Sequence, residues 1–212
     1  MTTRARRERE KKQRRQSILQ AAREAFSENG FHNATVDNVA ERAEVSKGTV
    51  YLYFKSKEAI LARLLLEGLD ELVEELEQAY AAEEPLPADE RLRRLAWAYL
   101  SFFQRESQYF PFLMAMDRGR FQEAIPSPVY REVLEASLEG LNLVVRAIEQ
   151  GSTENLFERR EAQESACIFW ATLNGVLQLM EHPLRREMVG MELETLYQAA
   201  LETIIQGLQM TR

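Results

Sequence analysis

The residues with the most specific chemistry lie between positions 46 and 53. Ser46, Lys47, Gly48 and Thr49 are small or polar, and they stand at the start of a predicted helix. Small residues at the start of a helix let its N–H groups approach a phosphate closely. This combination indicates contact with a nucleic acid.

The elements that must position these residues are two short helices. Residues 35–54 predict two amphipathic helices joined by Glu44-Val45-Ser46, close to the three- or four-residue turn of a helix-turn-helix. On the second helix small or polar residues face outward, whereas Val50 and Phe54 face inward. A helix that enters a major groove needs this division.

At these positions the chain resembles the tetracycline-repressor (TetR-type) family of bacterial transcription regulators. The similarity covers residues 16–60 and rests on Phe26, Gly30, Phe31, Thr35, the pair Val39-Ala40, the run from Val45 to Phe54 and the pair Lys57-Glu58. One departure is Glu44, where the family usually has glycine. Polar residues tolerate a positive φ better than most, so we expect a slightly altered turn there and not a different fold.

The resemblance assigns contacts with DNA to eight residues. It implies phosphate contacts for Thr35, Ser46 and Lys57, groove-facing positions for Lys47, Gly48, Thr49 and Tyr51, and a backbone contact for Tyr53. The alternative for each is surface solubility, or packing between helices for the two tyrosines. Val50 and Phe54 are expected in the core.

Charge is divided unevenly along the chain. Residues 1–60 carry 13 Lys/Arg and 8 Asp/Glu, a net charge of +5, whereas residues 61–212 carry 14 and 26, a net charge of −12. The segment from Arg4 to Arg15 alone contains eight cations and two carboxylates. It is either a solvated tail or an arm that follows the DNA backbone or reaches the minor groove.

Hydrophobic spacing predicts an all-α protein of about nine helices, without strands or internal repeats. We expect a first helix that ends at Asn29-Gly30, three helices capped by Thr35, Ser46 and Ser56, and later helices at about 89–104, 111–118, 127–150, 160–181 and 192–209. Residues 151–155 are expected to form a loop, and His182-Pro183 a turn. The predicted domains are residues 1–60, the DNA-binding domain with its basic arm, and residues 61–212, the ligand-binding and dimerisation domain.

Aromatic and methionine side chains concentrate between residues 97 and 121, around Pro111. Such a cluster forms either a core or the wall of an apolar ligand site. Since TetR-type proteins commonly build an apolar cavity in this region, the resemblance favours a small hydrophobic effector: a fatty-acyl compound, a drug or an aromatic molecule. The predicted effector-binding residues are Trp97, Phe102, Phe103, Phe110, Met114, Arg118, Trp170 and Asn174.

The last two predicted helices are apolar over so much of their circumference that they need a partner beyond their own core. By resemblance they pair with their twofold mates in a four-helix bundle and make a homodimer. The predicted interface residues are Phe169, Leu173, Val176, Leu177, Leu196, Ala200 and Ile204. Twofold symmetry would place two recognition helices about one DNA turn (about 34 Å) apart and hence predicts a palindromic operator in double-stranded DNA.

The composition argues against catalysis and against a membrane location. One cysteine, Cys167, and two distant histidines, His32 and His182, make neither a zinc set nor a Cys–His pair, and no Gly-rich phosphate loop occurs. We expect no catalytic residue, metal or cofactor. We find no apolar stretch long enough to span a membrane and no secretory signal, so we expect a cytoplasmic, nucleoid-associated protein.

The predicted function is that of a ligand-responsive transcription regulator, a repressor that a hydrophobic effector releases from its operator. The alternative keeps the fold but assigns it to chromosome organisation, without an effector. A lipid or acyl carrier with a vestigial DNA module is a third class, which predicts no salt-dependent operator binding.

Overall fold

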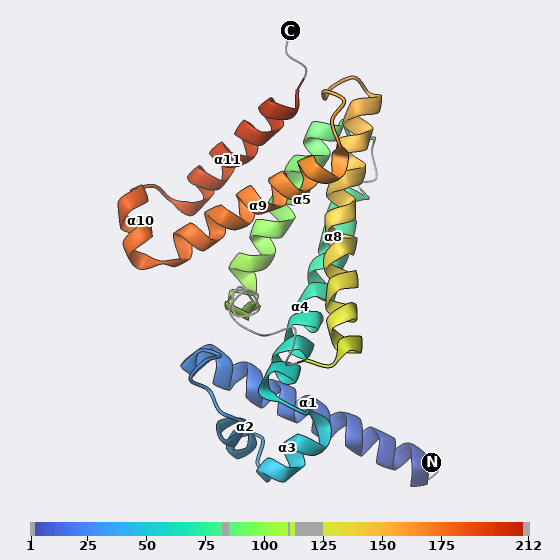
Figure 1. Ribbon diagram of the computed structural model, residues 1–212, viewed down its shortest axis with the longest axis vertical. Helices are drawn as coiled ribbons and strands as arrows, with labels where there is room; N and C mark the ends of the chain where they lie inside the picture. Colours follow the sequence, from blue (N-terminus) through green and yellow to red (C-terminus); the bar gives the residue numbers. More distant parts are fainter. Residues whose placement is uncertain (1–2, 82–84, 110, 113–124, 210–212) are drawn as a thin grey trace. The chain divides into compact units, whose positions relative to one another are not determined.

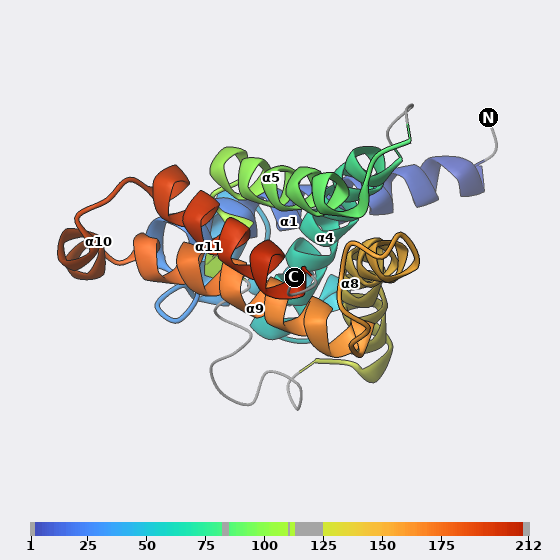
Figure 2. The same cartoon turned by 90° about the horizontal axis from the view of Figure 1, so that it is seen from above.

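The computed structural model describes residues 3–81, 85–109, 111–112 and 125–209, and this part of the chain is almost entirely helical (Figures 1 and 2). Its helices are α1 (Thr3–Asn29), α2 (Val36–Arg42), α3 (Lys47–Tyr53), α4 (Lys57–Tyr80), α5 (Ala88–Arg105), α8 (Ser127–Thr153), α9 (Ala162–Glu181), α10 (Pro183–Val189) and α11 (Leu193–Leu208). The all-α prediction is confirmed. Within the described ranges we find no helix long and apolar enough to cross a membrane.

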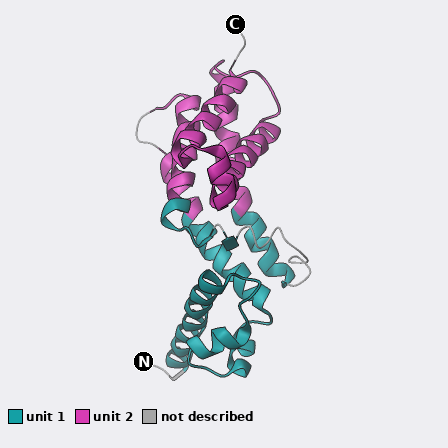
Figure 3. Ribbon diagram, turned by 90° about the vertical axis from the view of Figure 1, so that its left-hand side faces the viewer, with its two compact units in different colours: residues 1–71, 103–136 teal, residues 72–102, 137–212 magenta. Residues whose placement is uncertain are grey.

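The chain forms two compact units, coloured separately in Figure 3. Unit 1 comprises residues 1–71 and 103–136, and unit 2 comprises residues 72–102 and 137–212. Helices α4, α5 and α8 each contribute residues to both units. The predicted boundary at residue 60 divides the chain by function and does not coincide with a boundary between the two compact units. The division by function stays a prediction.

Unit 1 is built on the apolar face of α1. Ile18, Ala22 and Phe26 are buried there, at the helical spacing that the sequence predicts. Val39 of α2 and Val50 of α3 are also fully buried, so the two short helices are held by apolar contacts and not by their own length.

Hydroxyl side chains begin three of these helices. The Thr35 Oγ1 accepts from the backbone N–H of Asn38 at 3.2 Å, and the Asn38 side chain accepts from the Thr35 N–H at 2.9 Å, which completes a capping box. Ser46 accepts from the Thr49 N–H at 3.1 Å, and Ser56 accepts from the Ala59 N–H at 3.1 Å. All three predicted caps are confirmed.

Two residues with positive φ shape the connections of unit 1. Gly30, at φ 72°, follows the end of α1 as predicted. Glu44, at φ 52°, occupies the turn between α2 and α3 in the left-handed region, where a glycine would carry no steric cost. The turn still closes, since the Val45 N–H donates to the Ala40 carbonyl at 2.9 Å.

Unit 2 packs α9 and α11 side by side (Figures 1 and 2) and ties α11 to α5. The buried Tyr197 hydroxyl donates to the Ala96 carbonyl at 2.8 Å. Arg93 of α5 bonds both Asp89 and Glu202, and these hydrogen bonds raise the pKa of Arg93 and lower the pKa of Glu202. A polar clamp therefore reinforces an apolar contact between the two helices.

Two local expectations in unit 2 were wrong. Residues 151–153 continue α8, because Gly151 serves close packing and not a turn: a Cβ atom there would lie 2.1 Å from the buried Phe157 ring. After His182 the chain does not simply turn but forms α10, with Pro183 at its first position, where a missing N–H costs no hydrogen bond.

Candidate nucleic-acid interface

Helix α3 turns a strip of small and apolar residues away from the protein. Val50 is completely buried, whereas Tyr51 is 48% and Leu52 84% exposed. Lys47 and Gly48 are exposed and Thr49 is half-buried. The outer face of α3 is thus a nearly uncharged ridge with one cation at its start.

Gly48 is not required by the packing of the protein itself. A Cβ atom at this position would meet the Ser46 Oγ at 3.8 Å, an ordinary contact, and among the described residues nothing nearer. Its backbone also has no positive φ that would favour glycine. The missing side chain therefore leaves room for something outside the chain.

The polar residues predicted at this interface already have partners within unit 1. Lys47 Nζ pairs with Asp37 Oδ2 at 2.7 Å, and hydrogen bonding to that carboxylate raises the pKa of Lys47. The Ser46 and Thr49 hydroxyls lie 2.9 Å apart, and the Thr35 hydroxyl donates to Asn38 Oδ1 at 2.8 Å. Since all of these pairs are solvent-exposed, a phosphate could replace them at small cost.

Lys57 is held inside unit 1. Its ammonium group donates to the carbonyls of Phe31, His32 and Ala34 at 2.7, 3.3 and 2.9 Å and lies 4.4 Å from the centroid of the Phe31 ring. Desolvation by burial lowers the pKa of this amine. Three N–H donors of Lys57 are already used, so the residue has a structural role in this conformation, and its contact with DNA stays a prediction.

Leu52 is the surface residue that the sequence interpretation missed. We assigned apolar side chains of α3 to the interior, but Leu52 follows the buried Val50 by two positions, which on a helix is a rotation of about 200°. The helical spacing was the signal that could have revealed it. An exposed leucine beside a glycine suits contact with a thymine methyl group.

The comparison with protein families agrees with this geometry. Residues 18–64 match the model for bacterial regulatory proteins of the tetR family. Over this segment the chain is similar to the tetR family. The matched segment runs from the buried Ile18 through α2 and α3 into α4 and includes every residue predicted to contact DNA.

Individual relatives extend the similarity beyond this segment only in part. The fatty acid metabolism regulator protein of Bacillus subtilis is 41% identical over 69 residues, 32% of this chain and 36% of the relative. The transcriptional activator FasR of Mycolicibacterium smegmatis is 33% identical over 105 residues, 50% of this chain and 47% of the relative. The chain therefore spans less than half the length of these two relatives.

Among solved structures, the transcriptional regulator FadR from Bacillus subtilis, in complex with stearoyl-CoA, has a TM-score of 0.71. The match covers 92% of this chain and 99% of FadR, at 22% sequence identity. At this identity it shows that the fold is shared along most of the chain.

Two of the predicted effector-binding residues, Trp170 and Asn174, contact Tyr99 in unit 2. The Tyr99 hydroxyl donates to Asn174 Oδ1 at 3.3 Å and is also hydrogen-bonded to the Trp170 side chain, while burial raises the pKa of Tyr99. The Trp97 ring lies 5.9 Å from that of Tyr197. A polar centre among aromatic rings is the type of arrangement that orients a ligand.

Five further residues were predicted to bind the effector. Phe102 is buried in unit 2 and Phe103 is buried in unit 1. Phe110, Met114 and Arg118 lie outside the described residues.

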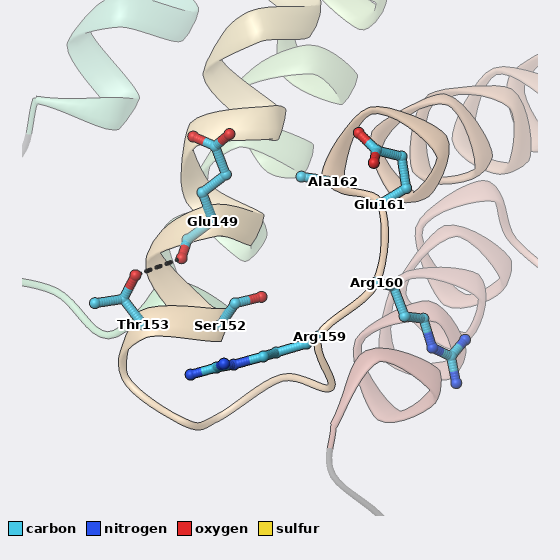
Figure 4. A pocket seen from close by; sticks show the side chains of 7 residues that line it. All are labelled: Glu149, Ser152, Thr153, Arg159, Arg160, Glu161 and Ala162. Carbon is cyan, nitrogen blue, oxygen red and sulfur yellow. Dashed lines mark hydrogen bonds between the residues drawn. The ribbon is translucent and has the colours of Figure 1, made fainter.

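Two cavities in the described chain are polar. One, of about 500 Å³, lies where α8 leads into α9 and is lined by Glu149, Ser152, Thr153, Arg159 and Glu161, among others (Figure 4). The other, of about 450 Å³, lies in unit 1 beside Arg23, Glu67 and Asp70, where burial and the charges of Glu132 and Glu67 raise the pKa of Asp70. Neither contains a residue predicted to bind a hydrophobic effector.

The predicted dimer interface needs a correction on α9. Phe169, Leu173, Val176 and Leu177 are at most 8% exposed within their own chain, so they form the core of unit 2. The exposed residues of α9 are on the opposite face and include Ile168, Ala171 and Gly175. On α11, Leu196, Ala200 and Ile204 are half-buried at helical spacing, as an interface stripe requires.

We predict that Lys57→Met lowers the free energy of unfolding by about 2–3 kcal/mol, because three carbonyls lose a charged donor. Lys55→Met, an exposed neighbour with the same change of charge, is the matched control and should leave stability unchanged. Chemical denaturation followed by circular dichroism measures both. Equal stability of the two variants would contradict the structural role of Lys57.

Proposed function

We propose that this chain is a dimeric transcription regulator that reads a palindromic operator through α3 and responds to a small hydrophobic effector. The observation that carries the proposal is the outer face of α3, where Gly48 leaves space that no packing within the chain requires. In the major groove this face would bring Thr49, Tyr51 and Leu52 against base edges. Lys47, Ser46, Thr35 and Tyr53 would meet phosphates at its borders.

The second element of the proposal is a homodimer formed through α9 and α11. Ile168, which is 54% exposed, shares the outer face of α9 with Ala171 and Gly175, so a second helix could approach closely there. The stripe of Leu196, Ala200 and Ile204 on α11 would complete a four-helix contact with the partner. Twofold symmetry then requires a palindromic operator.

The third element is the effector. The name of the Bacillus subtilis relative and the stearoyl-CoA bound to FadR point to fatty-acyl chemistry, which fits the aromatic residues Trp97, Trp170 and Tyr197 of unit 2. We propose that a long-chain acyl thioester is bound in unit 2 and weakens operator binding. Because α4 contributes residues to both units, it is the natural route of coupling.

Selection from random-sequence DNA supplies the operator for a test of this response. We predict that stearoyl-CoA weakens binding to the selected duplex 5- to 150-fold, the range of ordinary allosteric couplings of about 1–3 kcal/mol, whereas coenzyme A alone does not. Fluorescence anisotropy of labelled duplex measures the change. Operator binding that no acyl chain length alters would favour the alternative, a DNA-organising protein without an effector.

We predict that Gly48→Ala raises the stability of the protein but lowers its affinity for DNA. An alanine in α3 stabilises the helix by up to about 1 kcal/mol, because glycine loses more backbone entropy on folding. The added methyl group should nevertheless lower operator affinity on the order of tenfold, since it occupies the space left for DNA.

The matched control is Gly140→Ala in α8, where an added Cβ atom makes an ordinary contact with Leu76 at 3.4 Å. It should leave operator affinity unchanged. Unaltered affinity of the Gly48→Ala variant, with a folded protein, would remove α3 from the proposed interface.

A further inference from the structure

About three turns at the start of α1 contact no apolar core. Residues 4–14 are all exposed, and they continue without a break into the buried half of the helix that begins at Ile18. Figure 1 shows this end of α1, marked N, running on beyond α3. The basic segment found in the sequence is therefore a rigid helical projection of unit 1.

The cations of this projection are concentrated on one face. At 100° per residue, Arg4, Arg7, Lys11, Arg14 and Arg15 fall within an arc of about 100°, with Glu8 at its border. The arc is the continuation of the face that carries Ile18, Ala22 and Phe26 in the core of unit 1. We call these five residues the basic stripe.

One contact fixes the direction of the basic stripe. The Arg15 guanidinium lies 5.5 Å from the centroid of the Phe54 ring, and Phe54 is the buried residue that ends α3. Because Arg15 belongs to the stripe, the stripe faces the side of α1 on which α3 lies. Arg6 lies off the stripe and pairs with Glu10 at 2.8 Å.

We propose that the basic stripe is a phosphate-binding surface that runs along the DNA backbone next to the site of α3. This rests on the proposed function, since α3 must bring the duplex to this side of α1. A helix with side chains is about 10–12 Å in diameter, whereas the minor groove is about 6 Å wide, so a helical arm follows phosphates and does not enter that groove. Its contacts carry no sequence information and depend on salt.

The test compares two triple variants of the full chain with the same change in net charge. Arg4→Gln/Arg7→Gln/Lys11→Gln removes three cations of the stripe, and Arg6→Gln/Arg9→Gln/Lys12→Gln removes three off it. Glutamine keeps the helix propensity of the residues it replaces, which circular dichroism verifies. Affinity for the selected duplex is measured across a salt series, and phosphate ethylation interference identifies the contacted phosphates.

We expect the stripe variant to lose about 0.9 in the slope of log affinity against log salt for each phosphate contact removed, about 2.7 for three contacts in one protomer. In the stripe variant, ethylation of the corresponding phosphates should no longer interfere with binding. The off-stripe variant should keep both the wild-type salt slope and the wild-type interference pattern. Equal losses in the two variants, or no loss in either, would overturn the proposal. Wild-type protein that binds no selected duplex would instead contradict the proposed function itself.

Discussion

The half-buried ammonium group of Lys57 needs hydrogen-bond acceptors within unit 1, and three backbone carbonyls supply them. Helix α1 ends at Asn29, and the connection from Gly30 to Ala34 leads to the capping residue of α2. The Lys57 ammonium, at the start of α4, donates hydrogen bonds to three carbonyls of this connection. Since Thr35 begins α2 directly after this connection, the same interaction sets where α2 starts, and α3 packs on α2.

Several other polar residues of unit 1 stabilise the fold and are also proposed to contact DNA. Thr35 and Ser46 cap helices, yet both stay exposed at the helix ends where phosphates are best bound. Lys47 forms an exposed ion pair with Asp37, which holds the Lys47 side chain near the start of α3. In the proposed complex Gly48 leaves space for the DNA, and the basic stripe of α1 adds charge without sequence information.

Most of unit 1 could be predicted because its signals are local: caps at Thr35, Ser46 and Ser56, and an apolar face at helical spacing. Other features depend on contacts that form only in the folded chain. Gly151 was taken for a turn, although its missing Cβ atom makes room for the Phe157 ring. The carbonyl partners of Lys57 lie over twenty residues away, so its structural role could not be predicted. On α9, an apolar residue that faces its own core and one that faces a partner have the same chemistry, so Phe169 was placed on the wrong side.

The claim that α3 presents its Gly48 face to DNA is tested most directly by hydrogen exchange of the full chain, with and without the duplex selected from random sequence. The account predicts that amides of residues 46–53 exchange more slowly in the complex, together with those of the stripe, while residues 127–153 keep their rates. Tight binding that leaves residues 46–53 unprotected would contradict it.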